Sequence, residues 1–114
     1  MKANRLLVSM LFGIGLTGVS SGGFAQVDEA AATATLKRNN CTKCHAVDKA
    51  KKGPAFKKVA EKYKGKADAE NKLHDMVTKE PTVKFDDGTE EKHKVIDTQD
   101  PKELKNLFQY ILSR

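Results

Sequence analysis

Five consecutive residues, Cys41-Thr42-Lys43-Cys44-His45, constrain what this chain can fold into more than any other part of it. The spacing C-x-x-C-H is the attachment pattern of c-type haem. Its two thiols can bond to the two vinyl groups of one porphyrin, and the histidine that follows is then held under the iron. The motif therefore predicts a fold built around one covalent group that supplies both a large apolar core and a redox centre.

The first 25 residues have the order of a secretory signal peptide. Two basic residues precede an apolar run from Leu6 to Leu16, and Gly23-Phe24-Ala25 ends the segment with small residues suited to cleavage. A membrane anchor is the alternative, but the run is short and is interrupted by glycine and serine. We expect residues 1–25 to be a signal peptide and residues 26–114 to form one exported domain. No second apolar stretch long enough to cross a membrane follows, so a soluble periplasmic protein is expected.

The expected mature chain is small for a protein that must bury its own core. Its 89 residues contain no Trp and only two cysteines, both inside the motif. Chains of this length have difficulty burying enough apolar surface without a further stabilising element. A covalent haem would relieve that shortage.

Basic residues exceed acidic ones in residues 26–114. Without Lys2 and Arg5 the chain keeps 19 Lys and Arg against 15 Asp and Glu, which gives a net charge of +4. Much of the excess forms what we call the basic collar, namely Lys37, Arg38, Lys43, Lys49, Lys51, Lys52, Lys57 and Lys58. The collar is either a solvated face or a positive surface that steers an acidic redox partner. Nucleic acid is not expected as a partner, because the lysines are not interleaved with aromatic residues.

Apolar spacing and capping signals predict four helices. They cover residues 28–40, 55–63, 68–78 and a last helix that begins at Asp100-Pro101. Residues 80–99 differ, because the turn signal Asp86-Asp87-Gly88-Thr89 has short apolar pieces on both sides. A hairpin of two short strands and an irregular loop both fit this region.

Three segments in this order resemble class I bacterial cytochromes c, in particular the short cytochrome c-551/c-552 type. They are Cys41-Thr42-Lys43-Cys44-His45, Gly53-Pro54-Ala55-Phe56 and Tyr110-Ile111-Leu112-Ser113. The resemblance implies an all-α class I cytochrome c fold wrapped round one covalent haem c, with crossing first and last helices. It also implies that the haem is attached outside the bacterial inner membrane, in agreement with export.

The resemblance assigns roles to individual residues. Cys41 and Cys44 would form the haem thioethers, and His45 would be the proximal axial ligand. The carbonyl of Pro54 would accept the N–H of the proximal imidazole, which fixes its tautomer and makes it a better donor to iron. Leu36 and Tyr110 would be apolar residues at the helix crossing.

One departure from the family pattern concerns the second axial ligand. Related proteins supply a methionine from the loop before the last helix, and this chain has no methionine there. Two of its three methionines lie in residues 1–25, and Met76 lies in the predicted third helix. His93 lies in the right loop, 21 residues from the C-terminus, about where the methionine would be. We therefore predict that His45 and His93 are the axial ligands.

Other assignments of the distal ligand stay open at this point. His93 could be an exposed loop histidine between two lysines, and His74 or Met76 on the third helix could bind the iron instead. Met76 has the spacing of a core residue, and His74 that of a surface residue on a helix.

A haem with two protein ligands has no open position for a substrate. We therefore expect an electron carrier rather than an enzyme, working with redox protein partners as a monomer or as a small subunit of a redox complex. Imidazole in place of methionine predicts a low potential. The alternative is an open or displaceable distal site that binds a small ligand, for gas binding, sensing or minor peroxidase activity. Two alternatives would explain the cysteines without haem. A thiol redox pair fits less well because the chain lacks an alternating pattern of strands and helices to hold it. A structural zinc site fits less well because it needs about four ligands.

Overall fold

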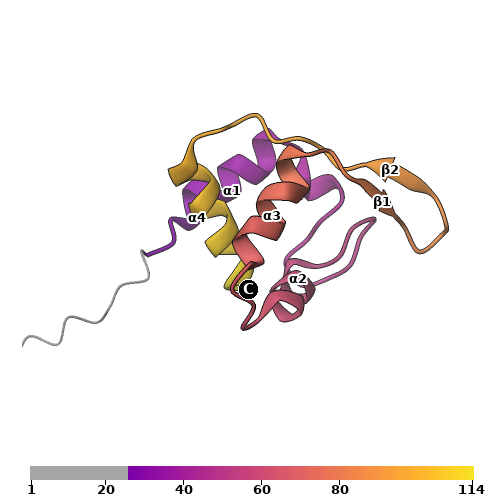
Figure 1. Ribbon diagram of the computed structural model, residues 1–114, viewed down its shortest axis with the longest axis horizontal. Coiled ribbons are helices and arrows are strands. Elements are labelled where there is room, and N and C mark those ends of the chain that lie inside the picture. The colour runs from indigo at the N-terminus through magenta and orange to yellow at the C-terminus, as the bar shows by residue number, and fades with distance from the viewer. Residues whose placement is uncertain (1–25) are drawn as a thin grey trace, which may run out of the picture.

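The computed structural model describes residues 26–114, and the predicted signal peptide lies outside the described residues. The elements in chain order are α1 (Glu29–Arg38), a short 3-10 helix η1 (Cys41–Lys43), α2 (Phe56–Tyr63), α3 (Ala69–Thr78), β1 (Thr82–Lys84), β2 (Glu90–Lys92) and α4 (Pro101–Leu112) (Figure 1). The four predicted helices are therefore confirmed, with shifts of one or two residues at their ends. In this part of the chain, no helix is both long and apolar enough to cross a membrane.

Local signals explain where the first and last helices begin. The side chain of Asp28 accepts a hydrogen bond from the backbone N–H of Ala31 and so caps α1. Asp100 does the same for Lys102 at the start of α4, where Pro101 occupies a position whose N–H would have no helical partner. Both ends place a carboxylate at the positive end of the helix dipole.

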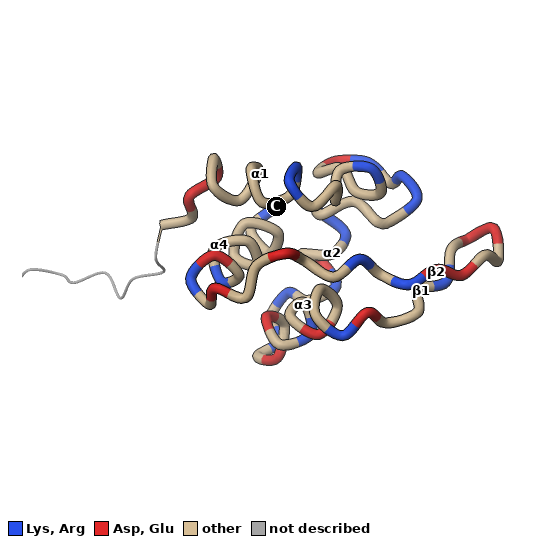
Figure 2. Tube along the Cα trace, turned by 90° about the horizontal axis from the view of Figure 1, so that it is seen from above, with Lys and Arg blue, Asp and Glu red and all other residues tan. Residues whose placement is uncertain are grey.

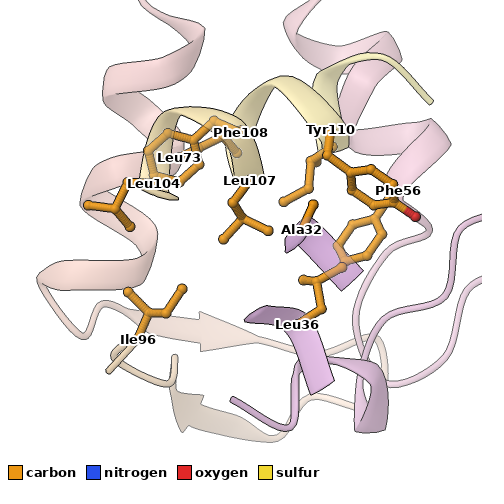
Figure 3. Packing of buried hydrophobic residues seen from close by; sticks show 10 residues of the cluster. Ala32, Leu36, Phe56, Leu73, Ile96, Leu104, Leu107, Phe108 and Tyr110 are labelled. Atoms are coloured by element: carbon orange, nitrogen blue, oxygen red, sulfur yellow. The ribbon is translucent and has the colours of Figure 1, made fainter. Parts of the chain in front are cut away.

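The core forms where α4 packs against the other helices. α1 and α4 cross, as the resemblance predicted (Figure 1). Leu36 of α1 and Tyr110 of α4 are buried in the same apolar cluster, together with Phe56 of α2 and Leu73 of α3 (Figure 3). Leu107, near the middle of α4, is only 1% exposed. This cluster holds the helices that surround the haem-attachment motif.

Residues 80–99 contain a hairpin, so the first of the two predicted alternatives holds for residues 82–92. β1 and β2 pair antiparallel, with Thr82 opposite Lys92 and Lys84 opposite Glu90. The turn is closed by the N–H of Phe85 on the carbonyl of Thr89. The hairpin projects beyond the helices (Figure 1). The fold is thus mostly helical, with one small sheet next to the segment that carries His93.

Candidate haem site

The C-x-x-C-H segment is wound into a tight turn directly after α1. Asn40 adopts a left-handed conformation, with a φ of 56°, that ends the helix and redirects the chain. The N–H groups of Cys44 and His45 then both donate to the carbonyl of Cys41. Side chains three residues apart in such a turn project to the same side. Cys41 and Cys44 are both free and partly buried, so one porphyrin edge can reach both sulfur atoms.

The surroundings of Cys41 argue against a thiol redox pair. Burial raises the pKa of the Cys41 thiol above its ordinary value, although the nearby charge of Lys94 acts in the opposite direction. Reactive thiol pairs instead lie in electropositive settings that lower the pKa. Among residues 26–114, no group of three or more His, Cys, Asp or Glu side chains is placed to hold a metal ion. The zinc alternative therefore has no ligand set in this region.

His45 is held from two sides. Its Nδ1 atom lies 2.7 Å from the carbonyl oxygen of Pro54, as the resemblance implied for these two residues. Its ring stacks on Phe56, with centroids 5.2 Å apart. Because a carbonyl oxygen can only accept, Nδ1 carries the proton and Nε2 keeps the lone pair that a metal needs. Burial lowers the pKa of His45, which further favours this neutral form.

Gly53 lies so close to the ring of His45 that only glycine fits at this position. A Cβ atom on residue 53 would lie 2.6 Å from Cε1 of His45 and 3.0 Å from both ring nitrogens. The backbone therefore runs directly against the imidazole. The N–H of Gly53 also donates to the carbonyl of Cys44, at 2.7 Å, which fastens this loop to the motif.

His93 lies opposite His45. The two ring centroids are 6.3 Å apart, with 46° between the ring planes. The N–H of His93 donates to the carbonyl of Pro81, at 2.8 Å, and its Nδ1 lies 3.1 Å from the carbonyl of Lys94. Three residues on, the N–H of Ile96 donates to the carbonyl of Val77 at the end of α3. These bonds hold the segment in front of the proximal histidine.

The separation of the two imidazoles fits one metal ion between them. A metal–imidazole bond is about 2 Å long, so two such bonds and the half-widths of two rings give about 6 Å between centroids. The hydrogen bond to Lys94 leaves Nε2 of His93 as the free acceptor, by the same argument as for His45. The two side chains named by the sequence as axial ligands thus lie at a separation suited to that role.

The two competing residues lie in other surroundings. His74 is exposed, and its ring meets the edge of Phe108, with centroids 6.4 Å apart, at a surface cleft between α3 and α4. The hydroxyl of Thr78, one turn further along α3, lies 3.5 Å from Nδ1 of His74. Met76 is partly buried on α3. Of the two other histidines among the described residues, His93 has a ring contact with His45, whereas the ring contact of His74 is with Phe108.

Ion pairs divide the basic collar into two groups. Arg38, Lys52, Lys57 and Lys58 are paired with carboxylates, and Lys51 donates to the carbonyl of Thr42. Lys37, Lys43 and Lys49 remain exposed, with no carboxylate partner among the described residues. Figure 2 also shows that acidic residues gather at the tip of the hairpin, which gives the molecule an uneven charge distribution.

The family model for cytochrome c matches residues 30–114. The chain belongs to the cytochrome c family. Members of this family carry one covalently attached haem c, and the fold described above is that of the class I cytochromes.

Individual relatives agree with this assignment. The crystal structure of the class 1 cytochrome MtoD from Sideroxydans lithotrophicus ES-1 is similar, with 55% sequence identity and a TM-score of 0.74 over 77% of this chain and 97% of that chain. Cytochrome c-551 of Pseudomonas aeruginosa is 37% identical over 73 residues, which are 64% of each chain. Cytochrome c-552 of Nitrosomonas europaea is 47% identical over 47 residues, which are 41% of this chain and 42% of that one. The matches thus span less than two thirds of these curated relatives.

Proposed function

We propose that this cytochrome is a periplasmic carrier of single electrons between redox partners, with His45 and His93 as axial ligands of its haem iron. The observation that carries the proposal is the 6.3 Å separation of the two imidazole centroids. A c-type haem with both axial positions filled by protein supplies one-electron exchange between ferric and ferrous iron. Such a carrier needs no substrate site, so we do not propose an enzymatic activity.

The protein's own residues would hold and orient the haem. Cys41 and Cys44 form the thioether bonds, which keep the group in place when an axial ligand changes or the small fold opens. Pro54 and Lys94 each offer a backbone carbonyl to Nδ1 of an axial histidine. These bonds fix the tautomer and orientation of both rings, so that Nε2 of each is available to a metal.

The axial pair sets the expected reduction potential. A methionine ligand raises the potential of a c-type haem relative to a second imidazole. Since His93 lies where related proteins supply methionine, we propose a potential below that of His/Met members of the family. The low potential rests on the ligand assignment and would fail with it.

The site of action and the partners are part of the proposal. The basic N-terminus and apolar run of residues 1–25 support export through a cleaved signal peptide. Lys43 lies inside the attachment motif and Lys49 lies four residues after it, and both are exposed without a carboxylate partner among the described residues, so they suit an acidic redox partner. Electron exchange with such a partner should slow as salt rises, because salt screens surface charge.

Spectra of the mature protein in both oxidation states test the ligand assignment. The proposal expects low-spin haem in the ferric and ferrous forms, and slow binding of carbon monoxide to the reduced protein. His93→Ala should produce a high-spin form that binds carbon monoxide rapidly, while His74→Ala, the matched control, should keep the wild-type spectrum. Rapid binding by the unaltered protein would instead favour the alternative of an open or displaceable distal site for a small ligand.

A further inference from the structure

The side chain of Lys52 bridges two segments that lie far apart in the sequence. Its ammonium group pairs with the carboxylate of Glu91 on β2 and lies over the ring of Phe85, 4.8 Å from the ring centroid. The loop that carries Lys52, between η1 and α2, reaches toward the hairpin in Figure 1. Among the hydrogen bonds, ion pairs and ring contacts of residues 26–114, Lys52 is the one residue that links this loop to the hairpin.

Both ends of this bridge lie close to a proposed axial ligand. Lys52 directly precedes Gly53-Pro54, the pair that contacts and orients the ring of His45. Glu91 lies two residues before His93 on the same extended segment. The bridge therefore joins the support of the proximal imidazole to the strand that presents the distal one.

Hydrogen bonds connect each side of the bridge to its own surroundings, so the position of Lys52 is coupled to the positions of the two histidines. The loop is tied to the motif by the N–H of Gly53 on the carbonyl of Cys44 and by Nζ of Lys51 on the carbonyl of Thr42. The strand is tied to β1, where Val83 lies opposite Glu91. Without the bridge, no hydrogen bond or ion pair among residues 26–114 would join the hairpin to this loop.

We propose that Lys52 is a positioning residue for His93, acting through Glu91 and Phe85 as a clasp that slows the exchange of the distal imidazole for external ligands. This inference rests on the proposed ligation of iron by His93. The clasp acts locally, because the side chains of Lys52 and Glu91 are 43% and 53% exposed and exposed ion pairs contribute little to global stability. Its strength also depends on salt, since exposed charges are screened.

Carbon monoxide binding to the reduced holoprotein provides the test, because the gas can bind only after the distal imidazole leaves. Lys52→Gln and Glu91→Gln should each speed binding about two- to fivefold, the range that corresponds to one exposed ion pair. The charge-swapped double variant, Lys52→Glu with Glu91→Lys, should recover part of the wild-type rate, because it restores the ion pair but not the contact of a cation with the ring of Phe85. Lys49→Gln and Glu90→Gln are the matched controls, one from the same loop and one from the same strand, and should leave the rate unchanged.

A purely structural role for Lys52 would give a different result. It would lower the melting temperature of Lys52→Gln without changing the rate of carbon monoxide binding, and this outcome overturns the clasp. Rising salt should speed binding to the wild type and should affect Lys52→Gln less. An equal salt effect in both proteins also contradicts the proposal.

The same measurements separate this inference from the function on which it rests. If His93→Ala changes the spectrum but Lys52→Gln leaves the rate unaltered, the clasp is wrong and the ligand assignment stands. If His93→Ala leaves the low-spin spectrum intact, the ligand assignment fails and the clasp fails with it.

Discussion

Asn39 and Asp97 exchange two hydrogen bonds across 58 residues of sequence. The amide of Asn39 donates to the carboxylate of Asp97, and the backbone N–H of Asp97 donates back to the Asn39 side-chain oxygen, both at 2.9 Å. Asn39 is only 2% exposed, and it also donates to the carbonyl of Thr35. This pair fastens the segment after His93 to the end of α1, immediately before the haem-attachment motif.

Replacing Asn39 by alanine should therefore be costly. The substitution removes the hydrogen bonds that the buried Asn39 side chain makes with Thr35 and Asp97, which costs about 1–3 kcal/mol of unfolding free energy. Denaturant unfolding of the holoprotein measures the loss. Asn71→Ala, on the exposed face of α3, is the control and should change stability little. Equal stability of the two variants would show that the exchange of hydrogen bonds contributes nothing.

Arg38 makes the same junction sensitive to acid. Hydrogen bonds from Arg38 and Asn39 lower the pKa of Asp97 from 3.8 to about 2. Since the folded state binds this proton less readily than the unfolded chain, the interaction stabilises the fold above about pH 4 and is lost as the pH falls toward about 2. The stability difference between wild type and Asp97→Asn should shrink over that interval.

Denaturant midpoints at several pH values check this prediction. Asp86→Asn, at the exposed tip of the hairpin, serves as control and should follow the wild type throughout. A wild type and an Asp97→Asn variant that lose stability in parallel as the pH falls would contradict the argument. Comparison between variants is necessary because protons also compete with the metal for the histidines that we propose as axial ligands.

Sequence patterns predicted the parts of this structure that have a period or a motif. The four helices follow from apolar spacing, the attachment segment from C-x-x-C-H, and the position of His93 from its distance to the last helix. The sequence could not distinguish the hairpin from an irregular loop. Each strand has only three residues, and β2 has no buried residue that would give an alternating apolar pattern.

The interactions that sequence reasoning missed are side-chain pairs between distant loops. Lys52 is one of the eight residues of the basic collar, and nothing near it in the sequence indicates a partner 39 residues further on. The sequence places Asn39 only near the end of the first predicted helix, residues 28–40, although its side chain is buried and hydrogen-bonded to Asp97. Such pairs have no periodicity, and an exposed or capping role is the usual one for these residue types.

Gly53 should not tolerate a side chain. In Gly53→Ala the new methyl group would meet the His45 ring at 2.6 Å, so the imidazole or the loop must move. We expect a loss of about 1–3 kcal/mol, as for overpacked sites, and an altered haem absorption spectrum. Gly65→Ala is the matched control, because its φ of +74° makes alanine strained while nothing lies within 4 Å of the added atom. That variant should lose stability but keep the wild-type spectrum.

His93→Met would place at the proposed distal position the methionine that the resemblance to class I cytochromes c implies. A thioether in place of the second imidazole should raise the reduction potential, by part of the about 0.8 V range over which axial ligands tune haem. Spectroelectrochemical titration of the two proteins measures the shift. Lys94→Met places a methionine one residue away without removing the imidazole, and its potential should stay near the wild-type value. If His93→Met and the wild type have the same potential and spectrum, another residue holds the distal position.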